Sequence, residues 1–198
     1  MMRCRPLLSN LAVLAGIAWS LSACQPTSSS AGEITPSSFD RPQWDTLTGV
    51  SNGTLLRAHV TSAFVSDRPL DIWLPKSYNG KRKHAVLYMY DGQMLFDTTE
   101  TWNHQEWRVD ETLDSLIDLH AVVPTIVVAL HNGGTQRNFE YFPQKPFELL
   151  PVSFADSLRQ SIARALNASP DIRVSSDLYL RYLIEEVKPM VNAQFATY

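Results

Sequence analysis

Two uncharged runs of six residues constrain the fold of this chain most strongly. They are Ala85–Tyr90 and Thr125–Leu130, and both are apolar at successive positions, so neither face of the corresponding strand is polar. Strands of this kind are typical of a mainly parallel sheet that is covered on both sides. Between them, Gln105–Leu119 carries apolar residues at near-helical spacing, with acidic residues toward the other side. The sequence therefore predicts a strand–helix–strand crossover and an α/β fold.

A pair of strands is predicted before this crossover. Leu55–Ser62 is rich in strand-forming residues, and Pro69–Pro75 alternates apolar and polar residues, which is the pattern of a half-buried strand. The polar run Ser66–Arg68 lies between them and suits a turn. We therefore expect an antiparallel pair that opens the sheet.

Two helices are predicted after the crossover. Ser153–Leu166 is amphipathic, and a last helix begins at Ser176 or Asp177, either of which can cap its N-terminus. Pro189 is expected to kink this helix. A strand follows such a helix in a β–α alternation, whereas only residues 196–198 remain, so we expect an incomplete sheet. The apolar stripe of the last helix consists of Leu180, Leu183, Ile184, Val187 and Val191.

The N-terminal segment has the features of an export signal. Two arginines precede the uncharged, largely apolar stretch Leu7–Leu21, which is short for a membrane span. It ends in the sequence Leu21–Cys24, which resembles the bacterial lipobox, where cleavage occurs before a cysteine that is then lipidated. We predict a signal peptide over residues 1–23 and lipidation of Cys24. The alternative is an ordinary signal peptide that is cut after Ala23.

Composition sets the predicted domain boundaries. Residues 24–45 contain a Ser-, Thr- and Pro-rich run and are predicted to be a tether, which leaves residues 46–198 as the folded domain. The only other cysteine, Cys4, lies in the predicted signal peptide, so the mature chain cannot form an internal disulfide. We expect a bacterial cell-envelope protein anchored at Cys24, and Gln25 favours the periplasmic face of the outer membrane in a Gram-negative host. The net charge of -3, without a basic stripe, argues against a nucleic-acid partner.

Four segments in chain order resemble the putative esterase family of α/β-hydrolases, which includes esterase D, enterochelin esterases and mycolyltransferases. The resemblance covers about residues 55–195 and implies a hydrolase in which a Ser–His–Asp triad forms and then hydrolyses an acyl-enzyme. It implies no cofactor, and the substrate stays open among siderophore esters, feruloyl or acetyl sugar esters and simple acyl esters. The segments are Asp71–Pro75 with Tyr78, His84–Gln93, Asn132–Gly134 with Arg137, Glu140, Tyr141 and Pro143, and Glu185–Val191.

The resemblance implies functional roles for two turns. After the first uncharged run, the backbone N–H of Gln93 would stabilise the negative charge on the substrate carbonyl oxygen, and Gly92 would allow close approach of the backbone. Without the resemblance, Asp91 and Gly92 are simply a tight turn. After the second run, a loop beside the substrate would include Asn132, Arg137, Glu140 and Tyr141.

Side chains near these turns have structural interpretations too. Arg137 and Glu140 are expected to pair with each other across one helical turn and to hold their loop, with substrate contact as the alternative. The five histidines show no ligand spacing, so no metal site is predicted. The aromatic residues that could line an acyl or aryl pocket, or simply pack, are Trp102, Trp107, Phe139, Tyr141 and Phe142.

One serine has the sequence pattern of a nucleophile. Gly49–Gly53 fits G-x-S-x-G around Ser51, but that motif needs a buried strand before the serine and a helix after it. A polar segment precedes Ser51, a strand is predicted after it, and Asn52-Gly53 is typical of a hairpin turn. We therefore expect that Ser51 is not the nucleophile and that the chain is an N-terminal part of a hydrolase domain, inactive alone, without the triad Ser, Asp and His. The alternative is a non-catalytic, lipid-anchored binding or scaffold protein.

Overall fold

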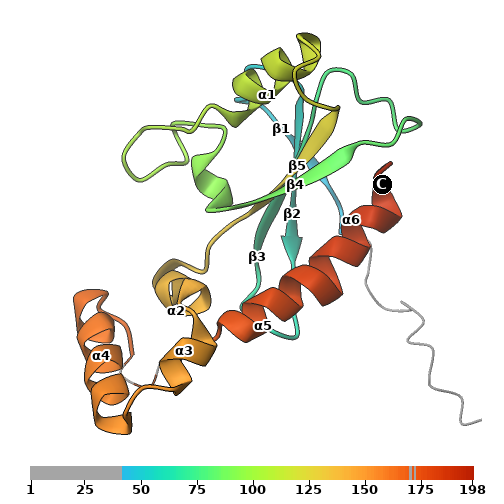
Figure 1. Cartoon of the computed structure of the whole chain (residues 1–198). Coiled ribbons are helices and arrows are strands. Elements are labelled where there is room, and N and C mark those ends of the chain that lie inside the picture. The colour runs from blue at the N-terminus through green and yellow to red at the C-terminus, as the bar shows by residue number, and fades with distance from the viewer. Residues whose placement is uncertain (1–41, 170, 172) are drawn as a thin grey trace, which may run out of the picture. The chain divides into compact units, whose positions relative to one another are not determined.

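The computed structural model describes residues 42–169, 171 and 173–198, which form a mixed sheet with helices on both faces (Figure 1). The strand order is β1-β2-β3-β5-β4, and β4 and β5 are the parallel neighbours, whereas the other pairs are antiparallel. The predicted α/β class, with an antiparallel opening pair and a parallel crossover, is confirmed. The strands are β1 (Asp45–Leu47), β2 (Thr54–Val60), β3 (Arg68–Leu74), β4 (Ala85–Tyr90) and β5 (Thr125–Leu130).

The two uncharged runs form β4 and β5 with the predicted bounds, and β2 and β3 begin within one residue of the expected positions. The sequence does not predict β1, because two of its three residues are polar and it pairs only with β2. β1 includes Asp45, and the indole N–H of Trp44 donates to Oε1 of Gln194 at 2.7 Å. Residues just before the expected boundary at residue 46 therefore also take part in the packing.

Helices connect the strands and cover the sheet. α1 lies in the crossover between β4 and β5, and α4 has nearly the bounds predicted for Ser153–Leu166. The last helical stretch is α-helical at both ends and π-helical in the middle. The helical segments are η1 (Gly92–Met94), α1 (Val109–Asp118), η2 (Gly134–Gln136), α2 (Arg137–Tyr141), α3 (Gln144–Glu148), α4 (Val152–Ala165), α5 (Ser176–Arg181), η3 (Tyr182–Val187) and α6 (Lys188–Gln194).

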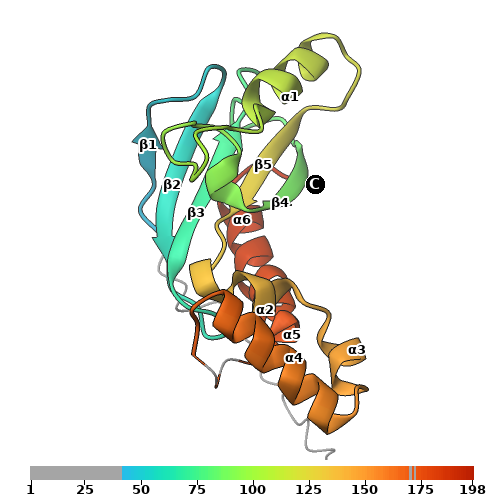
Figure 2. The same ribbon diagram turned by 90° about the vertical axis from the view of Figure 1, so that its left-hand side faces the viewer.

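Each face of the sheet has its own apolar core. The helices α5 and α6 run along one face (Figure 2), where Val187 and Val191 pack with Ile72, Val128 and their neighbours. α1 covers the other face, where Ile117 packs with a second cluster that includes Trp73. Because residues alternate between faces along a strand, β5 contributes to both cores and is buried almost throughout. These two layers fix the carboxyl ends of β4 and β5 side by side.

Two helical predictions are wrong in detail. The crossover helix does not begin at Gln105, because Arg108 has a left-handed backbone (φ 53°) and α1 begins at Val109. Trp107 is therefore not part of its apolar stripe, and half of that side chain is exposed (51%). In α4 the apolar stripe is only partly packed, since Phe154 is exposed.

The last helix buries part of the predicted stripe, since Val187 and Val191 are buried and Leu183 packs against the same core. Leu180 and Ile184 are exposed, whereas Tyr179 and Tyr182 are buried with Val187. The N-cap is the preceding Ser175, and no side chain caps the helix. In the π-helical segment η3, hydrogen bonds join residues five apart instead of four, which changes the spacing of side chains along the helix. This segment directly precedes the helical turn that contains Pro189, which has no N–H to donate. A period of 3.6 therefore assigns Leu180 and Ile184 to the core wrongly.

β4 is less buried than its uncharged sequence predicts. Leu87 is 40% exposed and Tyr90 is 42% exposed, because β4 is the edge strand and β5 pairs with one side of it only. Its other side meets residues 196–198 at one parallel bridge, in which the N–H of His84 donates to the carbonyl of Ala196 at 2.9 Å. The expectation that both faces of β4 are covered is wrong for this structure.

The predicted signal peptide, Cys24 and most of the predicted tether lie outside the described residues. Among the described residues, no helix combines the length and apolarity that crossing a membrane requires.

Candidate active site

The turn after β4 lies directly on the end of β5. Asp91 has a left-handed backbone (φ 55°), and η1 follows at once. A Cβ at Gly92 would lie 2.7 Å from the carbonyl carbon of Ala129 and 2.9 Å from Cδ2 of His131, closer than real Cβ atoms come. Only glycine therefore fits at this position without displacing the backbone, as expected for a turn that must approach its neighbour closely.

The side chain of Asp91 is clamped by the loop after β5. Arg137 donates to both carboxylate oxygens, at 2.6 Å each, and Nδ2 of Asn132 donates to Oδ1 at 2.7 Å. The backbone N–H of Asn132 in turn donates to Oε1 of Gln93 at 3.3 Å. Burial alone would raise the pKa of Asp91, but the hydrogen bonds from Arg137 and Asn132 outweigh it and hold the pKa below its usual value. The carboxylate is therefore ionised at neutral pH and fixes the turn to the loop.

The expected pairing of Arg137 with Glu140 is wrong. Glu140 instead forms a buried, bidentate ion pair with Arg68, at 2.6 and 2.8 Å. Tyr141 stacks on Tyr90, and the guanidinium of Arg137 lies 5.1 Å from the centre of the Tyr141 ring. Glu140 and Tyr141 thus belong to the packing beneath the loop, whereas Arg137 lies at the turn.

A cleft of about 590 Å³ opens beside the Asp91–Gln93 turn. It brings together Asp91, Gln93, Asn132 and Arg137 from the predicted site with two exposed tryptophans, Trp102 and Trp107. Phe139 in α2 is buried against Ala163 of α4 and does not line this cleft, and Phe142 packs on Phe147. The residues that line the cleft are Asp91, Gln93, Met94, Trp102, Asn103, Trp107, Asn132 and Arg137.

The backbone of the turn carries a hydrogen-bond donor that has no recorded partner among the described residues. The N–H groups of Met94 and Leu95 are used within the turn, since they donate to the carbonyls of Asp91 and Gly92. Within the described part of the chain, the N–H of Gln93 donates to no acceptor. A donor that is held in place and left free can stabilise an oxygen on which negative charge develops.

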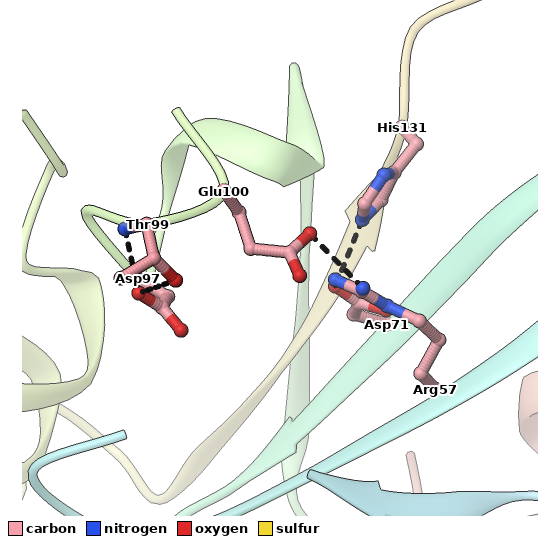
Figure 3. A network of polar contacts seen from close by, with 6 residues as sticks. All are labelled: Arg57, Asp71, Asp97, Thr99, Glu100 and His131. Carbon is pink, nitrogen blue, oxygen red and sulfur yellow. Dashed lines mark hydrogen bonds and ion pairs between the residues drawn. The ribbon is translucent and has the colours of Figure 1, made fainter. Parts of the chain in front are cut away.

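Sequence reasoning missed a buried polar network next to this turn. Asp71, which is 1% exposed, accepts hydrogen bonds from Arg57 and from Nε2 of His131, and Arg57 also binds Glu100 (Figure 3). Arg57 and Asp71 are direct cross-strand neighbours in β2 and β3. The available signal was a carboxylate in the middle of an otherwise apolar strand, which burial leaves uncharged or paired.

Ser51 lacks the surroundings of a nucleophile. It lies in a bend between β1 and β2, and its hydroxyl donates to the carboxylate of Glu111 at 2.9 Å. Its backbone N–H donates to Asp110 at 2.8 Å. Among the described residues no imidazole accepts a hydrogen bond from this hydroxyl, so the arrangement offers no base to activate it.

In Arg137→Met, the free energy of unfolding should change less with pH in the acid range than it does in the wild type. The folded-state pKa of Asp91 is depressed, so its stabilising contribution is present above the unfolded pKa of about 3.9 and is lost as pH falls through the folded pKa. Urea midpoints should show a deficit for Arg137→Met at pH 7 that shrinks below about pH 4. In an Asp91→Asn background the deficit should not vary with pH. By the same linkage argument, a deficit in the single variant that stays constant down to about pH 3 would contradict the assignment of Arg137 as the partner that lowers the pKa of Asp91.

Comparison with known proteins identifies the family of this chain. The model of the family described as Putative esterase matches residues 61–198. A CE1 ferulic acid esterase from Anaeromyces mucronatus, in complex with ferulic acid, is similar with 16% identity and a TM-score of 0.42, over 78% of this chain and 47% of that one. A feruloyl esterase module from Clostridium thermocellum, complexed with sinapinate, is 18% identical with a TM-score of 0.35, over 50% of this chain and 40% of that one.

The same Anaeromyces enzyme without substrate gives 16% identity and a TM-score of 0.42, over 79% of this chain and 53% of that one. The chain therefore spans about half the length of the solved structures that it matches. No curated protein sequence matches it significantly. Because the family model matches most of the described residues, the chain belongs to the Putative esterase family.

Proposed function

We propose that this chain supplies the oxyanion turn and one side of the substrate cleft of a serine hydrolase that cleaves carboxylic esters. The observation that carries the proposal is the free N–H of Gln93, on a turn that Arg137 and Asn132 clamp beside a cleft. Membership of the esterase family supports ester hydrolysis as the reaction.

The reaction requires a serine that attacks the ester carbonyl carbon while a histidine takes the serine proton. The carbonyl electrons move to the oxygen, and this oxyanion is where the N–H of Gln93 would donate, a contribution of about 3–4 kcal/mol to the transition state. The histidine then protonates the departing alcohol, and water hydrolyses the acyl-serine in a second, equivalent cycle. Asp91, Asn132 and Arg137 position the donor in both cycles.

We assign the nucleophile and its His and Asp partners to polypeptide that follows Tyr198 in a longer form of the protein. Supporting this, residues 196–198 already align parallel to β4, and the N–H of Tyr198 donates to the carbonyl of His84 at 3.2 Å. In α/β-hydrolases the nucleophile follows a strand of the central sheet at a sharp turn. A G-x-S-x-G segment within about 20 codons downstream would fit this assignment.

The remaining part of the proposal concerns location. Leu21–Cys24 supports lipidation of Cys24 and attachment to the cell envelope, at the periplasmic face of the outer membrane in a Gram-negative host. Metabolic labelling with a fatty-acid analogue should label the wild type in a bacterial host and should not label Cys24→Ser. Equal labelling of both proteins would show that Cys24 is not the lipidated residue.

The 198-residue chain should not hydrolyse p-nitrophenyl acetate above the rate of buffer, because the proposed oxyanion turn is present but Ser51 has no base among the described residues to activate it. The measurement is release of p-nitrophenolate by the purified protein. Ser51→Ala is the matched variant. Turnover that the substitution abolishes would make Ser51 the nucleophile, and turnover that survives it would show that another nucleophile is present.

A further inference from the structure

Asp71 is the centre of the network in Figure 3. Its Oδ1 accepts from Nε of Arg57 at 2.7 Å, and its Oδ2 accepts from both the second guanidinium nitrogen of Arg57, at 2.8 Å, and Nε2 of His131, at 2.8 Å. Burial would raise the pKa of Asp71, but these hydrogen bonds outweigh it and lower the pKa, so the group is an anion that fixes both partners.

His131 joins this network to the oxyanion turn. Its ring lies against Gly92, where an added Cβ would come within 2.9 Å of Cδ2. The next residue along the chain, Asn132, holds Asp91 through its side chain and Gln93 through its backbone N–H. The position of the imidazole therefore sets both where the backbone of the turn rests and where its clamp begins.

Glu100 joins the same network to the other side of the cleft. Its Oε2 accepts from Arg57 at 3.0 Å, and it belongs to the segment between η1 and α1 that carries Trp102 and Trp107. Figure 3 shows the carboxylates of Glu100 and Asp71 approaching the same guanidinium. One arginine thus touches a buried anchor and the cleft loop at once.

We propose that the ion pair of Arg57 and Asp71 is a shared anchor that positions both sides of the cleft, the oxyanion turn through His131 and the tryptophan-bearing loop through Glu100. The functional meaning of this anchor rests on the proposed esterase function, whereas the positioning itself does not. The residues of this network act as positioning residues, because they hold the turn and the loop in place. They are Arg57, Asp71, Glu100 and His131. His131 and Asp71 resemble a catalytic pair, but the carboxylate is already bound by a bidentate arginine, so we assign the pair to holding the turn.

Amide hydrogen exchange of the full chain, followed by NMR, can read the two sides separately. The N–H of Met94 donates to the carbonyl of Asp91 at 2.8 Å and reports on the turn, and that of His104 donates to Thr101 at 3.3 Å and reports on the loop. His131→Phe should speed exchange at Met94 about tenfold, the loss of one charge-assisted hydrogen bond, and leave His104 within about twofold. His131→Gln, whose amide N–H can reach Asp71, should restore the protection of Met94.

The other variants should give a crossed pattern. Glu100→Gln should speed exchange at His104 about threefold and leave Met94 unchanged, because this pair is partly exposed. Arg57→Lys keeps the charge but loses the fork that binds both carboxylates, so both reporters should accelerate. The matched control, Arg181→Lys in an exposed pair with Glu185, should affect neither.

Two results would overturn the proposal that the ion pair of Arg57 and Asp71 positions both sides of the cleft. One is equal acceleration of the reporters and of a core amide such as that of Ile126, since that is global destabilisation. The other is a reporter that does not respond to its own variant. If His131→Phe does not fold, the Glu100→Gln and Arg57→Lys pair still decides the question. Because no substrate is present, the outcome does not depend on whether the protein is an esterase.

Discussion

Replacing Glu140 by alanine should lower the free energy of unfolding by about 3–5 kcal/mol, the usual effect of removing one partner of a buried ion pair. Arg68 and Glu140 are 2% and 4% exposed, and the guanidinium binds both carboxylate oxygens. The hydrogen bonds and charge of Glu140 outweigh burial and raise the pKa of Arg68, so the arginine keeps its charge. Without Glu140 that charge is buried, with only Ser66 as a hydrogen-bond partner.

The measurement is urea denaturation followed by far-UV circular dichroism at pH 7. Glu185→Ala is the control. Glu185 pairs with Arg181, one turn earlier in the same helical stretch, and because this pair is exposed its loss should scarcely change the free energy of unfolding. The double variant Arg68→Met with Glu140→Leu should recover most of the loss, since neither charge then stays buried. A loss in Glu140→Ala no larger than in the control would show that the pair is dispensable.

Gly92→Ala should displace the Asp91–Gln93 turn and destabilise the chain by about 1–3 kcal/mol, the range found for overpacked sites. The added methyl would lie 2.7 Å and 2.8 Å from the carbonyl carbon and oxygen of Ala129, and backbone atoms cannot rotate away as a side chain could. In the complete enzyme of the proposed function, the same change should lower kcat by roughly 10²–10³, the effect of losing one oxyanion donor.

Gly134→Ala separates lack of space from backbone strain. Gly134 has a positive φ of +62° but no atom within 4 Å of the added Cβ, so only backbone strain of roughly 1 kcal/mol is expected. Thermal unfolding compares the two stabilities, and the Met94 amide resonance reports movement of the turn. Gly92→Ala with an unmoved Met94 resonance and unchanged stability would refute the close approach of the turn to β5.

The strands could be predicted well because apolar runs between polar turns specify them locally. Which strand lies at the edge could not, because Ala85–Tyr90 and Thr125–Leu130 have the same pattern and only the pairing distinguishes them. The three residues of β1 give too short a signal. The π-helical segment before Pro189 moves the buried stripe of the last helix, which a period of 3.6 cannot anticipate.

The site shows the same division between local and distant information. The Asp91–Gln93 turn and Arg137 were singled out through the family resemblance, and the structure brings them to one cleft. The predicted partner of Arg137 was wrong. Spacing along a helix suggested Glu140, whereas Arg137 binds Asp91, at the end of β4. Asp71 and His131 are far apart in sequence, so no spacing rule could pair them. A charged residue inside an apolar strand was the one warning.

The free edge of β4 affects how the protein behaves in concentrated solution. Its six residues carry no charge, proline or bulge of the kind that keeps edge strands from joining. As long as that edge stays open, the β4 strands of two molecules can pair and join their sheets. This pairing is favoured by higher protein concentration, because two molecules must meet.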